Sequence, residues 1–72
     1  MTVAGADHRG VAVWTEYEID GRRYTEVVVL APERTLLPRD RIAHGVRAWE
    51  RNVAREALEP WLARIGYEVL AP

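Results

Sequence analysis

The sequence predicts an α+β domain of two layers, in which an antiparallel hairpin and a short third strand pack against one long helix in the order ββαβ. Three observations predict this fold class. Residues 11–30 alternate with period two around an Asp-Gly dipeptide, and residues 39–58 place apolar side chains at helical spacing. Residues 67–70 then form a short apolar run after a glycine, which is typical of a strand that follows a helix end.

Length and composition limit the class of protein. A chain of 72 residues holds one domain with a marginal core, and we assign residues 1–10 to a flexible tail and residues 11–72 to the domain. Cysteine is absent, which excludes disulfides and cysteine-based zinc sites. No segment resembles a secretory signal or an apolar membrane span, so we expect a cytoplasmic protein without a membrane partner. The net charge of -1 gives no overall attraction to nucleic acid.

The hairpin has a defined register because Asp20-Gly21 is a strong signal for a two-residue turn. Folding the chain about this dipeptide produces two sets of cross-strand pairs. The pairs on the first face are Tyr17 with Tyr24, Val13 with Val28, and Val11 with Leu30. Those on the second face are Glu18 with Arg23, Glu16 with Thr25, Trp14 with Val27, and Ala12 with Val29. We expect the first face to receive the helix.

The second face of the hairpin retains three apolar residues, Trp14, Val27 and Val29. A sheet that packs only one face on a core is usually polar on the other, so these residues predict a further cover. Two kinds of cover are open at this point. One is a dimer interface or a partner protein; the other is the N-terminal tail or the C-terminal segment of the same chain.

The long helix is predicted to follow a connection, residues 31–38, whose two prolines cannot extend a central strand. It begins near Arg39-Asp40, where Pro38 and an acidic residue suit a first turn. Gly45 weakens it by roughly 1 kcal/mol, and Pro60 predicts a kink or break just before it. The apolar stripe of this helix is Ile42, Val46, Trp49, Val53 and Ala57.

The chain after the break is predicted to form a short helical segment, residues 60–65, capped by Gly66 in the left-handed conformation. Residues 67–70 then form the third strand. If the helix crosses one face of the hairpin, this strand runs antiparallel to the first strand when placed beside it, which gives the spatial order 2-1-3. No role is predicted for Trp61 beyond packing at the domain edge.

The polar side of the predicted helix carries a basic stripe, formed by Arg41, His44, Arg47, Arg51 and Arg55. Arginine offers a planar fork of donors that suits phosphate or carboxylate groups. Three interpretations are open: a solvated face paired with flanking glutamates, a contact with an acidic protein, or a nucleic-acid contact.

No constellation of residues indicates an enzyme. Serine and cysteine are absent, and His8 follows Asp7 in a segment predicted to be loose. Asp40 and His44 supply two metal ligands where a structural site needs four, and the glycines form no phosphate-binding motif. We therefore predict no catalytic residue, no cofactor and no metal.

These observations together predict a small non-enzymatic protein-interaction module, regulatory or inhibitory, that forms a homodimer or binds a partner protein. The predicted interface is Trp14, Val27 and Val29. The alternative is a nucleic-acid-binding protein that uses the basic stripe, although such domains are usually more basic than this chain.

Overall fold

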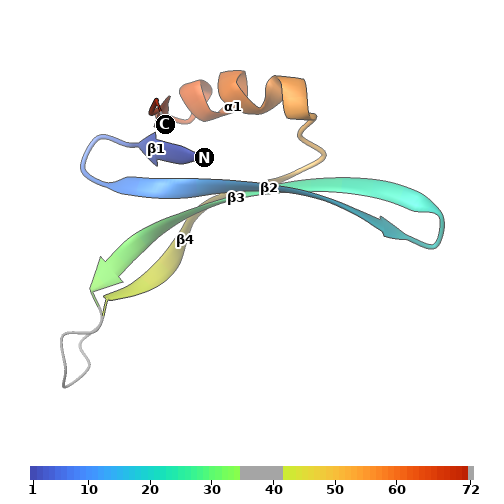
Figure 1. The fold of residues 1–72 in the computed structure, drawn as a ribbon, viewed down its shortest axis with the longest axis horizontal. Coiled ribbons are helices and arrows are strands. Elements are labelled where there is room, and N and C mark those ends of the chain that lie inside the picture. Colours follow the sequence, from blue (N-terminus) through green and yellow to red (C-terminus); the bar gives the residue numbers. More distant parts are fainter. Residues whose placement is uncertain (35–41, 72) are drawn as a thin grey trace.

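An antiparallel five-stranded sheet makes up most of the fold in the computed structural model (Figure 1). The structure describes residues 1–34 and 42–71, with side chains described for residues 1–32 and 45–71. The strands lie in the order β4-β3-β2-β1-β5. The elements along the chain are β1 (Thr2–Ala4), β2 (Arg9–Ile19), β3 (Arg22–Arg34), β4 (Ile42–Arg51), a 3-10 turn η1 (Arg55–Ala57), α1 (Leu58–Arg64) and β5 (Glu68–Val69).

The predicted ββαβ fold with one long helix is therefore wrong. Half of the segment assigned to the helix, Ile42–Arg51, is strand β4, and the described α-helix is only Leu58–Arg64. The predicted helix start near residues 39–41 lies outside the described residues. The domain is dominated by its sheet, and its helix is a short cap on one face.

A β-bulge explains why β4 resembles a helix in sequence. Val46 pairs with Leu30 and Ala48 pairs with Val29, so Arg47 is an extra residue with no partner in the ladder. Because of this insertion, Val46 and Trp49 lie on the same face although they are three positions apart. Spacings of three and four residues are the signature of a helix face, and a strand with a bulge reproduces them.

The hairpin of β2 and β3 confirms the predicted register. Every predicted pair is present, from Val11 opposite Leu30 to Glu18 opposite Arg23. The turn places Asp20 at φ 52° and Gly21 at φ 76°, as a two-residue turn with two left-handed positions requires. Local turn chemistry thus determines the pairing of the two longest strands.

Strand β3 runs through Pro32 instead of ending before it. Proline lacks a backbone donor and is excluded from the interior of a sheet. The pairing between β2 and β3 begins at Leu30, and beyond it β3 pairs only with β4, where Pro32 faces His44. The proline is tolerated because β3 has only one neighbour there.

The core lies between the sheet and α1, which covers one face (Figure 1). Small residues line this inner face: Ala12 and Gly10 are buried, and an added Cβ on Gly10 would lie 2.5 Å from the carbonyl oxygen of Leu30. These small residues leave room for the large side chains of the helix. The buried core residues are Val3, Ala12, Val27, Val29, Val53, Leu58, Trp61 and Leu62.

The C-terminal segment follows the prediction in part. Pro60 stands in the first turn of α1, where its missing donor costs no helical hydrogen bond. Gly66 has φ 95°, and the Tyr67 amide donates to the Leu62 carbonyl, as the predicted left-handed cap requires. Trp61, left without a role by the sequence, is a core residue that is 6% exposed.

The third predicted strand exists as β5, but it pairs with β1, with Val3 opposite Val69. The spatial order 2-1-3 is therefore wrong. The cause is that residues 1–10, predicted to be a flexible tail, contain strand β1, which pairs with β2. The N-terminal ammonium of Met1 donates to the Ala12 carbonyl over 2.8 Å, and the Ala12 amide donates back. This short strand fills the position beside β2.

Candidate interaction surface

The face of β2, β3 and β4 that lies opposite α1 carries two apolar rows, and we call it the outward face. Side chains on a strand alternate between the two faces, and β3 buries Val27 and Val29 toward α1, so Val28 and Leu30 point the other way. Each apolar row crosses all three strands. The rows are Val13, Val28 and Trp49, followed by Val11, Leu30 and Val46.

The apolar rows are open to solvent in the single chain. Val46 is 63% exposed and Trp49 is 49% exposed, and Val11 (45%) and Val13 (41%) add two further exposed apolar side chains. Val28 and Leu30, at the centre of each row, are half-buried by their neighbours. Scattered exposed apolar residues are common on proteins, but a contiguous patch of this kind is typical of an interaction site.

Charged and aromatic groups continue the outward face toward the hairpin turn. Glu26 and Arg51 are cross-strand partners in the row next to Trp49. The guanidinium carbon of Arg51 lies 5.0 Å from the centroid of the Trp49 ring, which is a cation–π arrangement. Beyond this row, Tyr17 and Tyr24 stack with centroids 5.6 Å apart.

The predicted interface residues lie on the opposite face, under α1. Val27 and Val29 are 0% exposed, and Trp14 is half-buried with its indole Nε1 donating to the Val53 carbonyl over 2.8 Å. The sequence left two kinds of cover open for this face. In the structure, the C-terminal segment of the same chain covers it. Val27 and Val29 therefore cannot form a surface, and the face assigned to the core is the open one.

The predicted basic stripe does not form one line. Arg47 occupies the bulge of β4, Arg51 lies on the outward face, and Arg55 begins η1; all three are exposed. Arg41 lies outside the described residues, as does the side chain of His44. A helix is absent from residues 42–51, so the geometric reason for treating these residues as one stripe is lost.

A polar cluster of Asp7, His8 and Tyr67 joins the turn before β2 to the C-terminal segment. His8 Nδ1 is 2.7 Å from Asp7 Oδ1 and His8 Nε2 is 2.8 Å from the Tyr67 hydroxyl. His8 Nε2 accepts from the phenol when the imidazole is neutral and donates to the phenol oxygen when it is protonated. Because the Asp7 carboxylate only accepts, Nδ1 donates to it in both forms. This hydrogen bond and the charge of His8 lower the pKa of Asp7 below its ordinary value.

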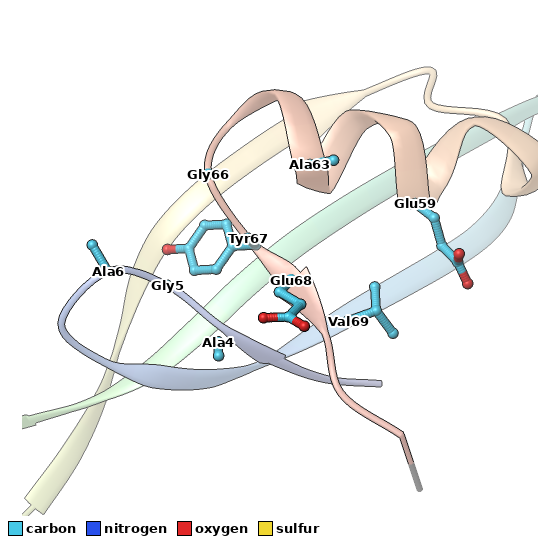
Figure 2. Close-up of a pocket in the computed structure, with 9 residues that line it drawn as sticks. All are labelled: Ala4, Gly5, Ala6, Glu59, Ala63, Gly66, Tyr67, Glu68 and Val69. Carbon is cyan, nitrogen blue, oxygen red and sulfur yellow. The ribbon is translucent and has the colours of Figure 1, made fainter.

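The same cluster borders a shallow depression shown in Figure 2, lined in part by Gly5, Tyr67, Glu59 and Glu68. The sequence did not predict a positioned Asp7–His8 pair, because it could not show that Tyr67 would meet it. Asp7 is 87% exposed, so solvent surrounds the acid end of this chain of hydrogen bonds. The rings of His8 and Tyr67 pack edge to face with centroids 5.4 Å apart. The cluster therefore links the turn before β2 to the residue that precedes β5.

No protein-family model, no curated protein and no solved structure matches the chain. Among the residues that the structure describes, no helix has the length and apolar character needed to cross a membrane. The described residues likewise bring together no group of three metal-ligating side chains. The outward face is an exposed apolar surface that no element of the described chain covers.

Proposed function

We propose that the protein is a small non-enzymatic protein-interaction module that binds through the outward face. The observation that carries this proposal is the pair of apolar rows on β2, β3 and β4, with Val46 and Trp49 about half exposed or more. An antiparallel sheet with one covered face normally turns polar residues toward water on the other. Here the uncovered face is apolar at its centre and charged at its border, which is the usual anatomy of an interface.

The identity of the exposed aromatic residue supports the same proposal. Tryptophan and arginine are enriched among residues that dominate binding energies, and Arg51 lies over the ring of Trp49. The sequence-based expectations of a regulatory or inhibitory role and of a cytoplasmic location remain part of this proposal. The proposed surface differs from the predicted one around Trp14, because α1 already covers that face.

Nucleic-acid binding is a second candidate, favoured by one observation. An exposed tryptophan beside an arginine, with two stacked tyrosines on the same sheet face, resembles the aromatic platforms that hold single-stranded nucleic acid. The aliphatic residues Val11, Val13 and Val46 offer no stacking surface for bases, and they occupy the centre of the face. Binding to single-stranded DNA or RNA that weakens steeply with salt would support this candidate over the first.

The proposal is tested by placing a photoreactive amino acid at position 49 and, as a matched control, at the exposed position 56 of η1. Irradiation in cells should produce adducts with protein from position 49 and none above background from position 56. Self-adducts and adducts with another protein both support a protein interface. Equal, background-level yields from the two positions would refute it.

A further inference from the structure

The chain exposes more surface than a self-contained protein of its size. Its accessible surface is 5772 Å², whereas a folded monomer of 8.2 kDa exposes roughly 4,500 Å². The radius of gyration is 14.0 Å, against roughly 11 Å for a compact chain of this length. Both figures indicate that the chain is less compact than a self-contained domain of its length.

We propose that a second copy of this chain covers the part of the outward face formed by β3 and β4, so that two sheets pack face to face in a twofold dimer. This inference rests on the proposed function and names the partner. The overlap involves β3 and β4 of each chain. Two strands about 4.8 Å apart, with outward side chains over roughly 30 Å of strand, give a footprint of about 300 Å² before side-chain relief. This footprint is below the roughly 800 Å² that a standard interface buries on each partner, so we expect a weak, transient dimer with a dissociation constant no tighter than the micromolar range.

The order of residues on β3 and β4 makes the outward face self-complementary. A twofold axis that runs along the strands between β3 and β4 exchanges these strands and leaves each row at its own level. It sets Val28 across from the partner's Trp49, and Leu30 across from the partner's Val46. In the next row it sets Glu26 across from the partner's Arg51, and by symmetry this charge pair occurs twice. Sheets packed in this way lie about 10 Å apart with nearly aligned strands.

Pairing through the free edge of β4 is a weaker alternative for the same two chains. The bulge at Arg47 interrupts the regular spacing of donors and acceptors on this edge strand. Bulges and charged side chains are the usual devices by which edge strands avoid pairing with other chains. The face of the sheet is therefore the better site for self-association, since its apolar rows are continuous across the bulge.

The decisive experiment uses Glu26→Arg and Arg51→Glu, each alone and then mixed, with sedimentation equilibrium as the measure of mass. In each single variant both charge pairs become like-charged, and we expect dimerisation to weaken on the order of 100-fold. In an equimolar mixture, the arginine introduced at position 26 of one variant faces the glutamate introduced at position 51 of the other. The remaining pair in this mixed dimer is the native one, so the mixture should regain a dimer of near wild-type affinity.

Glu56→Arg on η1 is the matched control, since it makes the same change of charge at an exposed site away from the outward face. It should leave the dimer unchanged. Two monomeric variants that recover a dimer only on mixing would support the proposal, and this recovery also shows that both variants fold. A wild type that stays monomeric at millimolar concentration would overturn it, as would a mixture that stays monomeric.

The failure of this inference is distinguishable from failure of the proposed function. If the wild type is monomeric and position 49 crosslinks to a different protein, the second copy is not the partner. The outward face would then still be an interaction surface. A monomeric wild type without any crosslink from position 49 overturns both.

Discussion

Replacing Val29 with alanine tests which face of the sheet is the core. Val29 is 0% exposed, so the substitution removes two buried carbons. At about 0.8 kcal/mol for each buried methylene, the transfer cost is about 1.6 kcal/mol, and the residual cavity brings it to about 2 kcal/mol. The matched variant is Val46→Ala on the outward face. Val46 is 63% exposed, so the same deletion costs the monomer only about 0.6 kcal/mol.

The assay is thermal and urea unfolding of both variants at a concentration where sedimentation shows a monomer. For a domain of this size the expected loss in melting temperature is about 8–16 °C for Val29→Ala and about 2–5 °C for Val46→Ala. Any difference in strand propensity between valine and alanine affects both variants. Equal losses, or a larger loss at Val46, would refute the assignment of the inner face to the core.

Three further predictions concern local contacts. Gly10→Ala should destabilise the fold by several kcal/mol, measured by urea unfolding, because its new Cβ would lie 2.5 Å from the Leu30 carbonyl oxygen; a loss within about 0.5 kcal/mol would contradict that close approach. Trp14→Phe should cost at least about 1 kcal/mol in the same assay, since the Val53 carbonyl loses its donor, and an unchanged stability would speak against this hydrogen bond. The lowered pKa of Asp7 means that its hydrogen bond stabilises the fold above the carboxyl group's ordinary pKa and that this contribution is lost as pH falls through the depressed folded value. Asp7→Asn should therefore flatten the fall in stability as the pH drops below the ordinary pKa of a carboxyl group, and identical slopes would contradict the prediction.

The sequence predicted the parts of the fold that depend on local chemistry. Asp20 and Gly21 determine the hairpin and its register, and Gly66 determines the end of α1, because left-handed positions strongly restrict which residues are allowed. The strand β5 was also expected, although its neighbour in the sheet was not.

The choice between the two faces of the hairpin could not be made from the sequence. Both faces carry apolar pairs, such as Val13 with Val28 on one side and Trp14 with Val27 on the other. The face that α1 covers depends on the path of the chain after β4. This path could not be predicted, because the bulge at Arg47 gives β4 the apolar spacing of a helix. The predicted register correctly grouped the outward-face residues of β2 and β3, but Val46 and Trp49 were assigned to a helix and the exposure of this face was missed.

Nuclear Overhauser effects between differently labelled chains show whether a second copy of the chain lies on the outward face. In a mixed sample of isotope-labelled and unlabelled protein, effects transmitted between chains are separable from those within one chain. We predict contacts between the indole protons of Trp49 and the methyl groups of the partner's Val28. Chains that associate without this contact, or that give no contact between chains at millimolar concentration, would contradict the claim.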